Sequence, residues 1–114
     1  MMDIQSHHTK LWFAGSRKNW ELAEFQVEEI EEAIEDIELF HSAKPETKSI
    51  VMLDDAVERV NAAIKNQNKE QFQSSFNFMT QSCNSCHQAN NVGFNVIKTP
   101  ETQPFGNQSF EARQ

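Results

Sequence analysis

The sequence of 114 residues has no tyrosine, only three glycines and three prolines, and no apolar run near the ~20 residues that a membrane-spanning helix needs. So few turn-forming residues favour helices over a many-stranded sheet. No basic segment followed by an apolar stretch opens the chain, so no secretory signal peptide is visible. The length fits one domain with a modest core. The sequence therefore predicts a single helical domain without membrane insertion.

Positive charge is also scarce, because 10 Lys and Arg residues stand against 17 Asp and Glu residues, for a net charge of -7. This balance argues against binding to nucleic acid or to an anionic membrane surface. It predicts a soluble protein with basic partners. A homodimer is also compatible with the sequence.

Cysteine is limited to two residues, both in the stretch Cys83-Asn84-Ser85-Cys86-His87. Cys-x-x-Cys-His is the pattern of c-type haem attachment. Two thiols three residues apart lie on one side of a helical turn, where both can form thioethers to the vinyl groups of one haem. His87 follows and can place an imidazole nitrogen on the iron as the proximal ligand. The motif predicts one covalent haem c, with its iron, at Cys83, Cys86 and His87.

Two other roles are open to the cysteines. A redox or disulfide Cys-x-x-Cys is expected beside a βαβ pattern, which the sequence lacks. A zinc site could combine Cys83 and Cys86 with histidines such as His7, His8 or His41, because zinc favours a tetrahedral set of nitrogen and sulfur ligands. No second ligand pair with regular spacing supports that site. A zinc-stapled helical interaction module remains as an alternative only if haem is absent.

Apolar residues recur every three or four positions over four stretches, about 3–15, 20–42, 47–67 and 69–90. This spacing is typical of bundle helices that bury one face. The predicted buried stripes are Ile4, His8, Leu11 and Gly15; Trp20, Ala23, Val27, Ile30, Ile34, Ile37 and His41; Ile50, Leu53, Val57, Val60 and Ile64; and Phe72, Phe76, Met79, Cys83 and Cys86. Both cysteines therefore continue the buried stripe of the fourth helix.

Short connections between the helices predict an all-α fold, an antiparallel up-down-up-down four-helix bundle. We expect Gly15 to cap the end of the first helix and Asn19 to cap the start of the second. The haem-binding bundle is assigned to residues 1–90, and residues 91–114 form an extended C-terminal tail. The phenylalanines of this tail are Phe94, Phe105 and Phe110. Either the tail is disordered, or these rings pack back over the bundle or the haem edge.

The second helical stretch carries nine acidic residues between its apolar positions. They are Glu21, Glu24, Glu28, Glu29, Glu31, Glu32, Glu35, Asp36 and Glu38. A solvated outer face explains them without any function. The functional alternative is an acidic docking surface for a basic partner. His41, at the end of this stretch, is interpreted as a helix C-terminal histidine favoured by the helix dipole.

With its Cys-x-x-Cys-His motif close to the end of a fourth helix, the chain resembles the cytochrome c-prime superfamily of four-helix-bundle c-type cytochromes. It also resembles a less characterised set of bacterial cytochromes with a similar first segment, here residues 8–15 followed by Asn19-Trp20, and a similar tail, here residues 107–110. The first helix and first loop are shorter than in ordinary cytochrome c-prime, and the tail is longer.

This resemblance implies Cys83 and Cys86 as the thioether positions and His87 as the iron ligand. Haem is attached to such sites outside the bacterial cytoplasm. We therefore expect a periplasmic protein whose signal peptide has been removed.

The sixth iron position decides between two functions, because axial ligand and distal pocket set the chemistry of a haem. A six-coordinate iron predicts electron transfer, and a five-coordinate iron with an open apolar pocket predicts binding of small gases such as NO or CO. In an alternating bundle the start of the first helix lies beside the end of the fourth, so the distal candidates are Met1, Met2, His7 and His8. His8 could instead be a structural histidine that bonds to a haem propionate.

Methionine in the first turn resembles the distal ligand of six-coordinate members of the superfamily. We therefore prefer Met2, then His8, as the distal metal ligand, and with either of them electron transfer. An enzyme of the peroxidase type would need polar distal groups and a catalytic pair. No convincing pair is evident, so no enzymatic activity is predicted.

Overall fold

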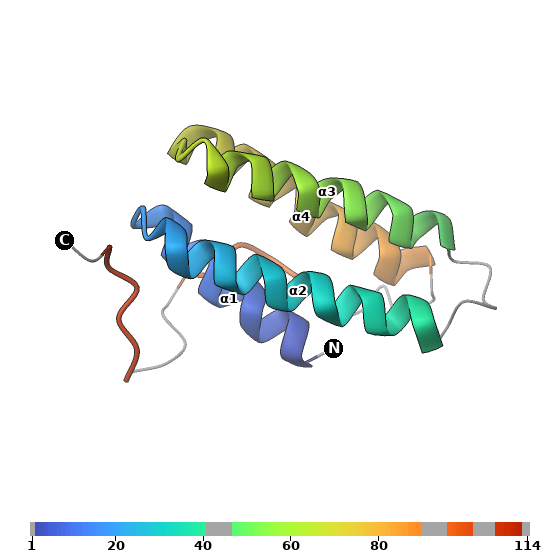
Figure 1. Cartoon of the computed structure of the whole chain (residues 1–114). Helices are drawn as coiled ribbons and strands as arrows, with labels where there is room; N and C mark the ends of the chain where they lie inside the picture. Colours follow the sequence, from blue (N-terminus) through green and yellow to red (C-terminus); the bar gives the residue numbers. More distant parts are fainter. Residues whose placement is uncertain (1, 41–46, 90–95, 102–106, 113–114) are drawn as a thin grey trace.

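A computed structural model describes residues 2–40, 47–89, 96–101 and 107–112 (Figure 1). The side chains within these ranges that lie outside the description are those of residues 2–3, 37–40, 47–51, 86–87 and 89. Four helices are formed, α1 (Met2–Ser16), α2 (Trp20–Phe40), α3 (Thr47–Lys65) and α4 (Lys69–Ala89). The described residues contain no β-strand, so the predicted all-α class is confirmed.

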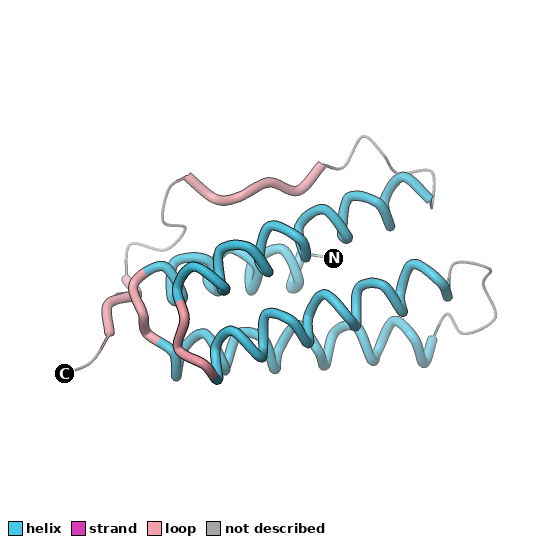
Figure 2. Tube along the Cα trace, turned by 90° about the horizontal axis from the view of Figure 1, so that it is seen from above, coloured by secondary structure: helices cyan, strands magenta, loops and turns pink. Residues whose placement is uncertain are grey.

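The helix bounds agree with the expected stretches to within two residues, apart from residues 41–46 and 90, which lie outside the described part. Helix α1 packs on α2, α2 on α3, α3 on α4, and α1 more lightly on α4 (Figures 1 and 2). None of the described helices has the length and apolar composition needed to cross a membrane.

The core lies between the four helices and is built from the predicted stripes. The buried members are Leu11, Ala23, Val27, Ile30, Ile34, Val57, Val60, Ile64, Phe72, Phe76 and Met79, together with the buried Gly15 and His8. Trp20 and Leu53 are partly buried against this cluster. Ile4 and Cys83 are partly buried, and the remaining predicted members Ile37, His41, Ile50 and Cys86 lie outside the described side chains. The three-four spacing is thus confirmed as a core pattern wherever it can be examined.

The turn between α1 and α2 shows that the expected cap at Gly15 is wrong. Lys18 takes the left-handed conformation, with φ at 59°. The Lys18 N–H bonds to the Gly15 carbonyl at 3.1 Å, and the Asn19 N–H bonds to the Ala14 carbonyl at 2.8 Å. This pair of bonds is a Schellman motif with Lys18 just beyond the helix end. Asn19 is confirmed as the N-cap of α2, because its Oδ1 accepts the Leu22 N–H at 3.3 Å.

Gly15 serves a different purpose inside α1. A Cβ at this position would lie 2.2 Å from Cζ of Phe72. Such a contact is far inside van der Waals distance, so the absent side chain lets the Phe72 ring lie directly on the α1 backbone. Glycine is therefore required here for close packing of α4 on α1.

The turn between α3 and α4 repeats the first turn. Gln67 is left-handed, with φ at 51°, and its N–H bonds to the Ile64 carbonyl at 3.0 Å. The Asn68 N–H bonds to the Ala63 carbonyl at 3.2 Å, and the Asn68 Oδ1 accepts the Gln71 N–H at 3.0 Å. One asparagine again closes one helix and opens the next. Both helical hairpins thus turn by the same mechanism.

Two described segments of the C-terminal tail lie against the bundle. Residues 96–101 run alongside α4 (Figure 2), and residues 107–112 lie at the turn between α1 and α2 (Figure 1). Phe110 is only 1% exposed, and its ring lies 5.7 Å from that of Phe13. Of the two predicted positions for the tail rings, Phe110 takes the one over the bundle. Phe94 and Phe105 lie outside the described residues.

Candidate haem-attachment site

The Cys-x-x-Cys-His motif lies in the last turns of α4, which remains helical as far as Ala89. At ~100° per residue, Cys83, Cys86 and His87 fall within an arc of about 100° on the helix circumference. Thr80 and Phe76, both buried, lie on or next to this arc about one and two turns before Cys83. Cys83 is partly buried, and the side chains of Cys86 and His87 lie outside the description. The motif therefore continues the face that α4 turns towards the bundle interior.

His8 on α1 lies against this face of α4. Its side chain is 3% exposed, and its ring centroid is 4.5 Å from that of Phe76. Nε2 of His8 is 2.8 Å from the Thr80 hydroxyl, which itself donates to the Phe76 carbonyl at 3.0 Å. Both bonds can form together only if Nε2–H of His8 donates to Thr80. Nδ1 then carries a lone pair, and this buried atom has no hydrogen-bond partner among the described residues.

The charge state of His8 follows from its burial. Desolvation lowers the pKa of His8 from its usual 6.5 to about 4. The imidazole is therefore neutral near pH 7. A neutral imidazole with an unshared nitrogen can accept a hydrogen bond or bind a metal. It cannot donate to a carboxylate through Nδ1 while Nε2–H is held by Thr80, which disfavours a direct bond to a haem propionate.

The other candidate ligands are distributed as follows. His7 lies between α1 and α2, where its Nδ1 is 2.5 Å from Oε1 of the buried Gln26 and its Nε2 is 4.0 Å from Glu29. Met2 is the first residue of α1, and its side chain lies outside the description. Met1 and His41 lie outside the described residues altogether. In the part of the chain that is described, no three His, Cys, Asp or Glu side chains are close enough together to hold a metal ion.

Asn84, between the two cysteines, makes contacts that sequence patterns did not predict. Its Nδ2 donates to the Ile97 carbonyl at 2.8 Å, and its Oδ1 accepts the Ile97 N–H at 2.7 Å. About two turns earlier on α4, Asn77 accepts a bond from the Thr99 hydroxyl at 3.3 Å. Extended chain of this kind has no periodic apolar signal, so sequence patterns could not predict this pairing.

The acidic residues form a dense cluster where α2 faces α3. The pKa of Glu31 is raised, first by its partial burial and then by repulsion from the carboxylates of Glu28, Glu35, Glu58 and Asp54. Five carboxylates from two helices thus contribute to one negative potential. The predicted acidic face of the second helix is therefore continued by α3.

The candidate site combines three features. They are the end of α4 that carries the two cysteines, the buried neutral His8 on α1, and the extended segment that Asn84 binds at Ile97. Each of these features comes from the chain's own residues and contacts. No model of a protein family matches the chain, and the comparisons with curated proteins and with solved structures gave no match either.

Proposed function

We propose that this protein is a c-type cytochrome of the four-helix-bundle kind, similar to the cytochrome c-prime superfamily, that transfers electrons in the periplasm. The observation that carries the proposal is the position of the Cys-x-x-Cys-His motif on the face of α4 that continues the buried residues Phe76 and Thr80. When bound, haem supplies an iron that cycles between the ferrous and ferric states. The chain supplies attachment, ligation and exclusion of water.

The proposal includes an up-down-up-down order of the helices. It is supported by the two tight turns and by the order of contacts between α1 and α4. His8 meets Thr80, Trp12 meets Phe76, and Gly15 meets Phe72, so residue numbers rise along α1 as they fall along α4. The start of α1 accordingly lies towards the motif end of α4.

Each residue of the motif has its own task. Cys83 and Cys86 hold the haem through thioethers, which keeps the ring at the end of the bundle. His87 binds the iron on the proximal side. Thr80 and Ser82, which are buried just before the motif, have small side chains, and a close-packed interior does not keep a haem-sized void. The donor set of two thiols and one imidazole thus fits a covalently held haem.

The proposed distal ligand is Met2, followed by His8. Met2 lies six residues before His8, or about 9 Å along α1, and His87 lies seven residues after Thr80, or about 10 Å along α4. Because His8 and Thr80 are in contact, Met2 and His87 come to a similar level of the bundle. His8 can bind iron through Nε2 only by releasing Thr80, whereas its Nδ1 already offers a lone pair.

Absorption spectra of the protein matured with its secretion signal test the function. We expect a low-spin, six-coordinate spectrum that becomes high-spin in Met2→Ala and stays low-spin in His8→Ala. A change only in His8→Ala would move the ligand to histidine. A high-spin wild-type spectrum with ready binding of CO or NO to the ferrous form would replace electron transfer by gas binding. The absence of a Soret band in protein matured with haem-attachment machinery would end both and favour the zinc-stapled module.

The proposed partner is a basic redox protein that docks on the acidic cluster of α2 and α3. Complementary charge mainly accelerates encounter, and salt screens exposed charges beyond about 8 Å at physiological ionic strength. Partial burial and then repulsion from four neighbouring carboxylates raise the pKa of Glu31, and the second of these causes supports the proposal. The net charge of -7 points in the same direction.

A further inference from the structure

Asn84 binds both backbone groups of Ile97 through one planar amide. The two bonds, 2.8 Å from Nδ2 to the carbonyl and 2.7 Å from the N–H to Oδ1, copy the pairing of a neighbouring β-strand. Asparagine presents a donor and an acceptor side by side, and aspartate could supply only the acceptors. Both bonds are partly buried, so water competes with them less than at an open surface.

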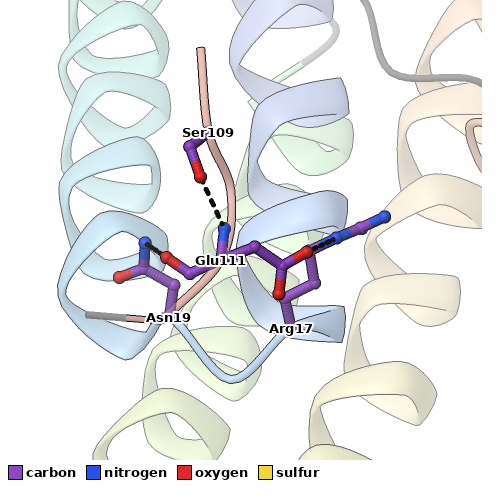
Figure 3. Close-up of polar contacts among 4 residues, drawn as sticks. All are labelled: Arg17, Asn19, Ser109 and Glu111. Atoms are coloured by element: carbon purple, nitrogen blue, oxygen red, sulfur yellow. Dashed lines mark hydrogen bonds and ion pairs between the residues drawn. The ribbon is translucent and has the colours of Figure 1, made fainter. Parts of the chain in front are cut away.

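The segment held in this way continues to a second anchor. After Ile97 the chain runs back along α4, where the Thr99 hydroxyl bonds to Asn77. Residues 109–111 then dock at the turn between α1 and α2 (Figure 3). Arg17 Nε donates to Glu111 Oε1 at 2.8 Å, and Asn19 Nδ2 donates to the Glu111 carbonyl at 3.0 Å.

We call residues 96–101 and 107–112 the strap. Its far end is fixed by the burial of the Phe110 ring against Phe13, and its near end by Asn84. The two anchors lie at opposite ends of α4. The strap therefore spans the bundle from the cysteine motif to the turn between α1 and α2. A segment fixed only at one end would not resist movement at the other.

We infer that Asn84 is a positioning residue, which locks the strap onto the haem-attachment turn so that the two move as one unit. The haem part of this inference rests on the proposed function. Asn84 follows Cys83 directly, so any motion of the strap at Ile97 acts on the backbone between the two cysteines. The strap also covers Asn84 in part, because both bonds between Asn84 and Ile97 are partly buried.

Hydrogen exchange of the full-length protein tests the locking. In Asn84→Ala the exchange of the Ile97 amide should accelerate about tenfold, since two partly buried hydrogen bonds are lost. The peptide that covers residues 83–89 should exchange faster as well. Asn77→Ala is the matched control, because it lies on the same helix, gains the same helix propensity and loses only one side-chain contact with the strap. Asn84→Gln, which keeps the amide, should restore part of the protection.

Unchanged exchange at Ile97 in Asn84→Ala, or equal acceleration in Asn77→Ala, would overturn the locking. If amide exchange in Asn84→Ala accelerates at Ile97 but not over residues 83–89, Asn84 holds the strap, but the strap is not coupled to the haem-attachment turn. Neither result depends on haem, and the haem content of the same sample is measured by absorbance, so a failure of the proposed function is distinguished from a failure of the strap.

The reduction potential of the haem-loaded protein provides the readout that a purely structural residue would not move. A released strap admits water to the attachment turn, and water stabilises the more highly charged ferric iron. The potential should therefore fall in Asn84→Ala and stay at the wild-type value in Asn77→Ala. Equal potentials in the wild type and in Asn84→Ala would contradict the positioning role.

Discussion

The two ends of α4 are built differently. At its start, the Phe72 ring lies on the bare backbone of Gly15, and two Schellman turns close the helices around it. Towards its other end, Thr80 and the partly buried Cys83 replace the rings, and the neighbouring His8 keeps a buried nitrogen without a partner among the described residues. The first end is completed by the chain's own side chains. We propose that the second end is completed by the haem.

The largest expected effect concerns the buried histidine and its dependence on pH. The pKa of His8 is about 4 in the folded protein and near 6.5 in the unfolded chain, so the unfolded state binds more protons between these values. The contribution of His8 to stability should be constant above pH 6.5, fall as the pH decreases towards 4, and lose on the order of 3 kcal/mol in total. Urea midpoints measured from pH 7.5 to pH 4 would follow this loss.

The control for the pH effect is the neighbouring histidine. His8→Leu should remove this component of the pH profile, whereas His7→Leu, at a half-buried position beside Gln26, should keep it. A profile of His8→Leu identical to that of the wild type would assign the acid sensitivity to other groups.

Gly15→Ala should break the tightly packed end of the bundle. Its Cβ would lie 2.2 Å from the Phe72 ring, and overpacking of this kind costs about 1–3 kcal/mol. Thermal or urea unfolding measures the loss. The double variant Gly15→Ala/Phe72→Leu should show positive coupling in a double-mutant cycle, because the smaller side chain makes room for the added methyl group. Additive losses would show that the ring is not what excludes the methyl group.

The predicted and observed structures differ most where one residue type can serve either a local purpose, such as a helix cap, or a contact between helices. The stripes of Val27, Ile30, Val57 and Val60 were predictable, because a helical period depends only on the chain itself. Glycine near a helix end is expected both at a C-cap and at a close contact, and only the position of Phe72 on another helix decides between them. The prediction of a helix cap at Gly15 was therefore wrong.

For a related reason, the sequence left the position of the tail open between disorder and packing of its phenylalanines on the bundle, and it did not predict the contacts of the strap. Ile97 and Phe110 belong to irregular chain with no period, and their burial depends on partners that are distant in sequence, such as Asn84 and Phe13. The motif is read directly from the sequence, because Cys83, Cys86 and His87 have the local spacing that haem attachment needs, and the haem itself stays a prediction.

Lys18→Gly and Gln67→Gly should stabilise the end of the bundle that holds the two tight turns. Both residues have positive φ, which costs a residue with a Cβ more than it costs glycine, so each variant should gain about 0.5–1 kcal/mol of unfolding free energy. Lys65→Gly, in the last helical position of α3, is the control and should lose a similar amount. A loss in all three variants would contradict the left-handed turns.

The smallest expected effect is kinetic. Glu28→Gln/Glu35→Gln should slow association with a basic redox partner a few-fold at low salt and weaken its salt dependence. The pKa of Glu31, which lies between them, should be raised less in this variant. Glu70→Gln/Glu101→Gln removes the same charge from exposed positions elsewhere and should change the on-rate less. Equal changes of the on-rate in the two double variants would show that the acidic cluster is not a docking surface and serves only solubility.

The intact mass of the protein matured with its secretion signal and haem-attachment machinery tests the central claim most directly. We predict one haem added per chain, retained after acid-acetone extraction and lost in Cys83→Ala/Cys86→Ala, which should keep its helical signal but lose cooperative melting. An unmodified mass, obtained in a preparation in which a control c-type cytochrome is loaded with haem, would contradict the proposal.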